Sequence, residues 1–117
     1  MTFEFIDFEK NPLAIIKCPE GVKLNFNRDP LREEGNIVTL NVKKDKLGIL
    51  GPVWDKMFTM KTENINGFNI LNEDNNIIIS KYENIILNGI VYELDTSLIN
   101  DDRVDVIEFI TISFYNR

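Results

Sequence analysis

The sequence predicts an all-β fold, or a β-rich α+β fold, built as an antiparallel sandwich or barrel of about seven to nine strands. One short helix is expected near residues 52–60. Three observations lead to this prediction. β-branched and aromatic residues dominate the apolar set, whereas alanine, the best helix former, occurs only as Ala14. Short segments alternate between apolar and polar residues. Turn-forming residues separate these segments at intervals of about eight to twelve residues.

The first half of the chain contains four predicted strand segments, at residues 2–8, 13–17, 22–26 and 36–43. In the first of them Phe3 and Phe5 share one face. The Cys-Pro-Glu-Gly sequence at 18–21 lies between the second and third segments and predicts a hairpin turn. Residues 29–35 predict a single helical turn, which Asp29 caps and Gly35 ends. Residues 43–48 form a charged turn.

The predicted helix near 52–60 rests on helical spacing. Val53, Trp54, Met57 and Phe58 fall on one helical face, and Pro52 suits the first turn. Residues 58–62 also alternate with a period of two, which is typical of a strand. Helix and strand therefore compete for this region, and the helix is favoured.

The second half contains two Asn-Gly pairs, at 66–67 and 88–89, which predict type I′ hairpin turns. The flanking β-rich residues make the second prediction stronger. Residues 72–76 predict a polar turn, and residues 95–102 predict a loop. Residues 103–115 give the longest strand signal, and apolar residues on both of its faces indicate a central or bent strand.

Size and charge limit the class of protein. With 117 residues, 44% hydrophobic and 27% charged, the chain predicts one globular domain over residues 1–117. The formal net charge of −6 disfavours direct binding to nucleic acid and to anionic membranes, whereas it attracts a protein with a basic surface. The same acidity is also what simple solubility requires.

The absence of a signal peptide, of a membrane-spanning run and of paired cysteines predicts a cytoplasmic location. The abundant Asn and Ile suggest a low-GC bacterium or its phage.

The residue types give little support for catalysis, so we expect no enzyme, no catalytic residues and no cofactor. The chain has no histidine, and its single cysteine, Cys18, is expected to be structural. No phosphate-binding glycine loop occurs. Asp95, Asp101, Asp102 and Asp105 offer oxygen ligands for a hard cation, but their spacing matches no calcium loop. A solvated acidic loop is the preferred interpretation, and no metal site is predicted.

The predicted function is inhibition of a partner protein by covering its basic surface. Toxin-neutralising immunity proteins and phage-encoded inhibitors of host defence share the general traits of this chain, which are small size and acidity. The residues expected to contact the partner are acidic residues of two loops and the single tryptophan: Glu33, Glu34, Asp101, Asp102 and Trp54. Trp54 is either an interface anchor or a core residue.

Two other functions are consistent with the sequence. One is a structural or assembly β-module of a phage, or a homo-oligomer, in which an edge strand pairs between copies. The first strand, with Phe3 and Phe5, is the candidate for that pairing. The other is a β-barrel that encloses a small ligand.

Overall fold

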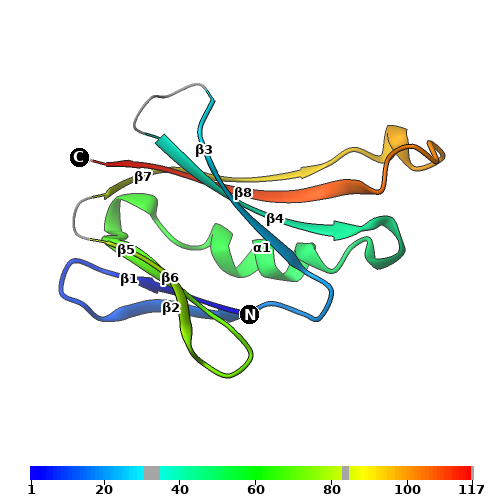
Figure 1. The fold of residues 1–117 in the computed structure, drawn as a ribbon. Coiled ribbons are helices and arrows are strands. Elements are labelled where there is room, and N and C mark those ends of the chain that lie inside the picture. The colour runs from blue at the N-terminus through cyan, green and yellow to red at the C-terminus, as the bar shows by residue number, and fades with distance from the viewer. Residues whose placement is uncertain (31–34, 83–84, 117) are drawn as a thin grey trace.

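The computed structural model describes residues 1–30, 35–82 and 85–116, and these residues form two four-stranded antiparallel sheets that face each other (Figure 1). Sheet A has, in spatial order, the strands β2 (Pro12–Lys17), β1 (Thr2–Ile6), β5 (Gly67–Leu71) and β6 (Ile77–Tyr82). Sheet B has, in spatial order, β3 (Lys23–Arg28), β4 (Gly35–Lys43), β8 (Val106–Asn116) and β7 (Ile85–Leu94). The predicted all-β class is confirmed, and the arrangement is a sandwich.

The helix α1 (Leu50–Phe58) lies between the two layers of strands, behind β3 in Figure 1. Its buried face consists of Leu50, Val53 and Met57, spaced three and four residues apart. This confirms the helix predicted near 52–60. The competing strand interpretation of residues 58–62 is wrong, because burying that face against both sheets decides the conformation. Three short 3-10 helices, Lys44–Lys46, Thr62–Asn64 and Thr96–Leu98, complete the described elements.

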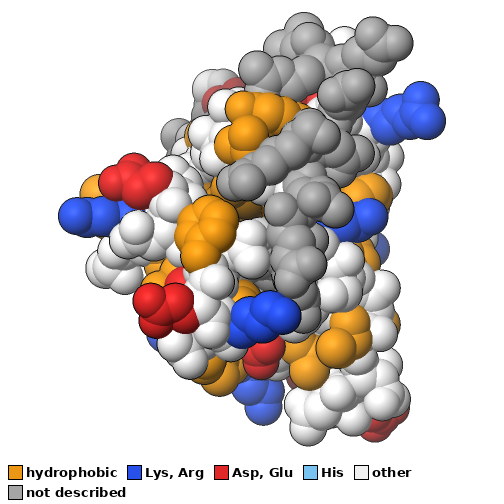
Figure 2. All heavy atoms as spheres, turned by 90° about the vertical axis from the view of Figure 1, so that its left-hand side faces the viewer, with side chains coloured by type: hydrophobic (Ala, Val, Ile, Leu, Met, Phe, Trp, Pro, Cys, Tyr) orange, Lys and Arg blue, Asp and Glu red, His pale blue; other side chains and the backbone are white. Residues whose placement is uncertain are grey.

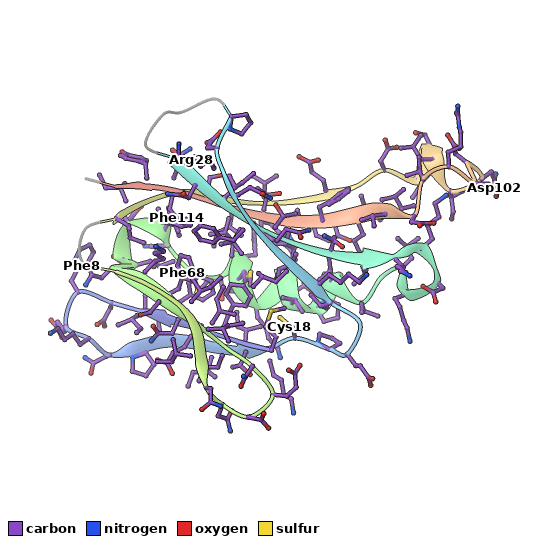
Figure 3. All side chains as sticks on the ribbon, viewed as in Figure 1. Phe8, Cys18, Arg28, Phe68, Asp102 and Phe114 are labelled. Carbon is purple, nitrogen blue, oxygen red and sulfur yellow. The ribbon has the colours of Figure 1, made fainter. Side chains whose placement is uncertain are left out.

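Phenylalanine rings form the centre of the core (Figure 3). Phe68 of sheet A lies 6.4 Å from Phe3, 6.1 Å from Phe5 and 5.4 Å from Phe114 of sheet B, measured between ring centroids. The Phe68–Phe114 pair is edge-on, one of the arrangements that aromatic rings prefer. All four rings are buried. They come from alternate, inward-facing positions of their strands, so the alternation in the sequence is what builds the core.

The sequence predicts a central position for the last strand and an edge position for the first. β8 pairs with both β4 and β7, which confirms that the last strand is central. β1 pairs with both β2 and β5, so the prediction that the first strand is an edge available for pairing between copies is wrong. Phe3 and Phe5 are fully buried between the sheets, and the backbone of β1 is paired on both sides.

The hairpin predicted around residues 18–21 is also wrong. β2 belongs to sheet A and β3 to sheet B, so the chain crosses from one sheet to the other there. Gly21 has a φ of +93°, which allows the tight change of direction. A turn sequence specifies the local reversal of the chain, but it does not specify whether the following strand pairs with the preceding one.

Neither Asn-Gly pair forms a hairpin turn. Gly67 begins β5 and pairs with Ile6 and Tyr82, while Asn88 lies at a register shift inside β7. The non-glycine residues with positive φ among those described are Lys10 and Asn75, not Asn66 or Asn88. Three hairpins whose turns lie wholly within the described residues turn instead at 7–11, 72–76 and 95–105, and the second of these confirms the predicted polar turn. Most of the helical turn predicted at 29–35 falls on residues 31–34, outside the described residues.

The two sides of the sandwich differ. α1 contacts β2, β7 and β8, and so it closes the side where β2 and β7 are the outermost strands. On the other side the outermost strands are β3 and β6, and there the Lys81 Nζ lies 5.6 Å from the centre of the Phe26 ring. That side has no covering helix among the residues described.

Candidate functional site

The acidic residues predicted to bind a partner come from two loops. Glu33 and Glu34 lie outside the described residues. Asp101 and Asp102 lie in the loop that connects β7 to β8, at the far end of that hairpin (Figure 3). The Lys44 Nζ donates hydrogen bonds to the backbone oxygens of Ile99 (3.3 Å) and Asp101 (2.6 Å), which fixes the loop against the start of the 3-10 helix Lys44–Lys46.

The two acidic residues of this loop differ in their surroundings. The Arg103 guanidinium donates to both carboxylate oxygens of Asp101 at 3.0 Å, and these hydrogen bonds lower the pKa of Asp101. Its negative charge is therefore already paired. The Asp102 side chain is exposed, so it is the better placed of the two to meet a partner.

The described residues next to the first predicted acidic segment lie far from the second acidic loop. Gly35, which follows the first loop, is opposite Tyr115, whereas Lys43 at the other end of β4 is opposite Val106, near the second loop. β4 has 9 residues, which span about 30 Å at roughly 3.3 Å per residue. Arg28 and Asp102 accordingly lie at opposite ends of the molecule (Figure 3). At the end shown in Figure 2, acidic, basic and apolar side chains are interspersed over the described atoms.

Trp54 lies half-buried on α1 and packs against the core. Its ring is 6.0 Å from Tyr92 of β7 in a stacked arrangement and 5.7 Å from the exposed Phe58 of α1. One edge of this aromatic cluster is therefore part of the packing between α1 and sheet B, and the other edge reaches the surface.

Sequence reasoning missed Glu108, a fully buried carboxylate on β8. Its Oε2 accepts a hydrogen bond from the Tyr92 hydroxyl at 2.5 Å, and its Oε1 accepts from the backbone N–H groups of Gly48 (3.1 Å) and Leu50 (3.4 Å). α1 has no side-chain cap of its own, so Glu108 supplies acceptors at the helix N-terminus. Burial, followed by this hydrogen bond, raises the pKa of Tyr92 to about 12. The signal in the sequence was a single charged residue inside the apolar strand 106–112.

Cys18 is buried between β2 and the chain crossing that follows it. Burial raises the pKa of its thiol to about 11, so the thiolate is scarce near neutral pH. The described part of the chain contains no cluster of three or more His, Cys, Asp or Glu side chains arranged to hold a metal ion. No helix within the described ranges combines the length and apolar character needed to cross a bilayer.

The most distinctive surface is the outer face of sheet B, which we call the B face. The side chains of Val38, Leu40, Ile110 and Ile112 point into the core, and the alternate residues of the same strands point outward to form the B face. The strand registers identify the outward residues of the two neighbouring strands. They are Lys23, Asn25 and Asn27 of β3; Ile37, Thr39 and Asn41 of β4; Phe109, Thr111, Ser113 and Tyr115 of β8; and Ile86, Gly89, Val91 and Glu93 of β7.

The B face is almost without charge. Lys23 and Glu93 are its charged members, and they lie on the two edge strands. Between them, one row across the sheet runs from Asn25 through Thr39 and Thr111 to Val91, which is 50% exposed. Asn41 is buried, and the other side chains of the face are half-buried or exposed. In a chain that is 27% charged, a sheet face of hydroxyl, amide, aliphatic and aromatic groups that reaches solvent is unusual.

The outer face of sheet A has a different character. There the Ser80 hydroxyl donates to Asn69 Oδ1 at 2.6 Å, and Asn69 Nδ2 donates to the Glu4 carboxylate at 3.3 Å. This ladder satisfies polar groups of three adjacent strands within the protein itself. Asn25, Asn27, Thr39, Thr111 and Ser113 of the B face form no such ladder, so these polar groups are better able to bond to a partner.

Comparison of this chain with protein-family models, with curated proteins and with solved structures found no match.

Proposed function

We propose that this protein binds another protein through the B face and thereby covers a functional surface of that partner. The observation that carries the proposal is the composition of the B face. The centres of protein–protein interfaces are depleted in Lys, Glu and Asp and enriched in aromatic residues, and the B face has both properties. Phe109 and Tyr115 on the central strand β8 are its aromatic members.

The size of the B face sets a requirement on the interface. The nine residues of β4 and four strands about 4.8 Å apart give a flat area on the order of 500 Å². A stable complex buries about 800 Å² on each partner. The contact therefore extends beyond the sheet, and the nearby β7–β8 loop with Asp102 is a suitable extension.

Electrostatics favours a partner whose contact surface is neutral at its centre and basic around it. The protein carries a net charge of −6, to which Glu33 and Glu34 contribute, and Glu93 and Asp102 lie on the β7–β8 hairpin. These negative charges accelerate association with a basic partner and disfavour acidic partners. The uncharged centre of the B face supplies most of the surface that the complex buries. Occlusion of a basic surface is the inhibitory mechanism that follows from this distribution.

The test compares one charge introduced on each face of the sandwich. Val91→Glu places a carboxylate on the B face, and Ile15→Glu places one at a 63% exposed position on the edge strand of sheet A. Each variant and the unchanged protein are used for affinity capture from the native host, followed by quantitative mass spectrometry. Circular dichroism establishes that both variants are folded.

We expect one partner to be recovered with the unchanged protein and with Ile15→Glu, and its recovery to fall by about tenfold or more with Val91→Glu. Added salt should slow the association, because steering by charge is screened. Equal recovery with the two variants would refute the B face as the interface. Self-association that Val91→Glu abolishes, measured by light scattering, would assign the face to a homo-oligomer instead.

A further inference from the structure

The side of the sandwich opposite α1 contains a hollow of about 300 Å³ between the edges of the two sheets. Phe26 of β3 and residues of β6 line it: Ile78, Ile79, Ser80 and Lys81. Phe26 remains 40% exposed even though its ring packs 6.0 Å from Phe114 of the core. Ile77 and Ile78 on the facing strand are 59% and 50% exposed. An apolar surface is therefore left open beside two strand edges.

The backbone of β3 is able to accept another strand. The Asp29 N–H donates to the Gly35 oxygen at 2.9 Å, which makes residues 29 and 35 a hydrogen-bonded antiparallel pair. Such pairs alternate along a ladder, so Asn27 and Asn25 also bond to β4. The N–H and C=O groups of Leu24 and Phe26 consequently point away from β4. β3 is the last strand of its sheet among the described strands, so these groups face outward.

The two strands that border the hollow carry a net positive charge, opposite in sign to the net charge of the whole protein. β3 and β6 contain three cationic residues, Lys23, Arg28 and Lys81, and neither strand contains Asp or Glu. By the register of β3, Arg28 is on the same, inward side of the strand as Phe26. The Lys81 Nζ lies 5.6 Å from the centre of the Phe26 ring. The hollow thus has an aromatic floor with cationic groups on the strands that border it.

We propose that an extended acidic segment of another protein adds to the β3 edge as a fifth strand of sheet B. Its backbone bonds to the outward groups of Leu24 and Phe26, as in recognition by strand addition. One apolar side chain of the segment enters the hollow beside Phe26, and an Asp or Glu two residues away, on the same face, meets the cationic pair Arg28 and Lys81. This site uses a strand edge and is separate from the B face.

Inward-pointing lysines also protect edge strands from aggregation, and the test distinguishes that role from peptide binding. The probe is a fluorescently labelled nine-residue peptide in which Ile and Asp alternate on one face and Thr occupies the other. One control peptide has Lys in place of Asp. A second control carries N-methyl groups on its Ile residues, which removes backbone donors that face β3 in an antiparallel pairing and keeps the side chains. Fluorescence anisotropy measures affinity, and amide NMR shifts locate the contact.

We expect the Asp peptide to bind at least tenfold more tightly than either control at low salt, and to shift the amides of Leu24 and Phe26. Arg28→Glu combined with Lys81→Glu should reverse the preference between the Asp and Lys peptides. Lys81→Met removes one of the two charges without adding one, so it should weaken the preference and leave the part that Arg28 supplies. Val91→Glu, on the B face, should leave peptide binding unchanged, so that failure of one proposal is distinguishable from failure of the other.

Equal binding of the Asp and Lys peptides would overturn the proposal, as would binding of the N-methylated peptide with the affinity of the Asp peptide. If no peptide binds and Lys81→Met self-associates, as detected by light scattering, the role of Lys81 is instead to prevent pairing of this strand edge between copies of the protein.

Discussion

At the scale of single residues, the most informative side chain is Glu108. Its two carboxylate oxygens accept hydrogen bonds from Tyr92 of β7 and from the backbone of Gly48 and Leu50 at the start of α1. One side chain on β8 thus links two strands and the helix. A buried carboxylate is tolerated only where donors surround it, and these three donors satisfy that condition.

Replacement of Glu108 should therefore be costly. Glu108→Ala leaves the buried Leu50 N–H and the part-buried Gly48 N–H and Tyr92 hydroxyl without their acceptor, and it should lower the free energy of unfolding by about 2–4 kcal/mol. Glu108→Gln keeps one acceptor oxygen for the backbone groups and should cost about half as much. Urea denaturation of the two variants measures the difference, and equal costs would contradict the assigned hydrogen bonds.

Cys18 predicts how stability changes at alkaline pH. Burial raises the pKa of its thiol from 9.0 to about 11. Below pH 9 the thiol is protonated in the folded and unfolded chains alike, and its contribution to stability is complete. Between pH 9 and 11 the unfolded chain releases the proton first, so stability should fall as the pH rises.

Removal of the thiol isolates this effect. In Cys18→Ala, the decrease in the free energy of unfolding between pH 9 and 11 should be smaller than in the unchanged protein. Tyr92, whose pKa is also raised, titrates in both proteins and cancels in the comparison. Identical pH profiles from urea denaturation would mean that the thiol is accessible to water.

Among the secondary-structure elements, the turn that precedes α1 depends on backbone conformation as well as on side chains. Gly48 has a φ of +98°, and a Cβ placed there meets no atom within 4 Å. Any cost of a larger residue at this position is therefore backbone strain and not a clash. Gly51, in the first turn of α1, has equally open surroundings and no positive φ. The two glycines form a matched pair.

The same substitution should have opposite effects at these two positions. Gly48→Ala should destabilise the protein by about 1–2 kcal/mol, because L-residues are strained at positive φ. Gly51→Ala should stabilise it by about 0.5 kcal/mol, because alanine loses less backbone entropy in a helix. Thermal denaturation of both variants tests the pair. A loss of stability at both positions would indicate that unseen contacts, and not φ, control this turn.

At the scale of the whole molecule, one aromatic cluster joins the two sheets. Phe68 contacts Phe3 and Phe5 in its own sheet and Phe114 in the other. Because both sheets and α1 contribute to the same core cluster, they should unfold together. The fluorescence of Trp54, which reports on α1 and sheet B, should therefore change in parallel with the circular dichroism of the strands.

Truncation at the centre of this cluster should affect the whole fold. Phe68→Ala should cost about 3–5 kcal/mol, since it removes a fully buried ring and leaves a cavity. Phe58→Ala removes an exposed ring and should cost less than about 1 kcal/mol. Denaturation followed by fluorescence and by circular dichroism gives both values. Separate transitions for the two signals would show that the sheets are not one cooperative unit.

Local patterns in the sequence are sufficient to predict the fold class, the helix and the central position of the last strand. These properties follow from local periodicity: alternate residues build the inner faces of the strands, and the spacing of Val53 and Met57 builds the buried face of α1. The sequence also indicated that acidic loops exist and that histidine chemistry is absent.

Tertiary structure alone decided which strands pair and which residues meet. The turn at 18–21 leads into the other sheet and Asn88-Gly89 lies within a strand, because burial of the phenylalanine core outweighs local turn preference. The B face and the hollow beside Phe26 are assembled from strands distant in sequence, and the β4–β8 pairing places Gly35 and the loop with Asp102 at opposite ends of β4. Long-range strand register, which no local pattern encodes, is the physical reason for the difference.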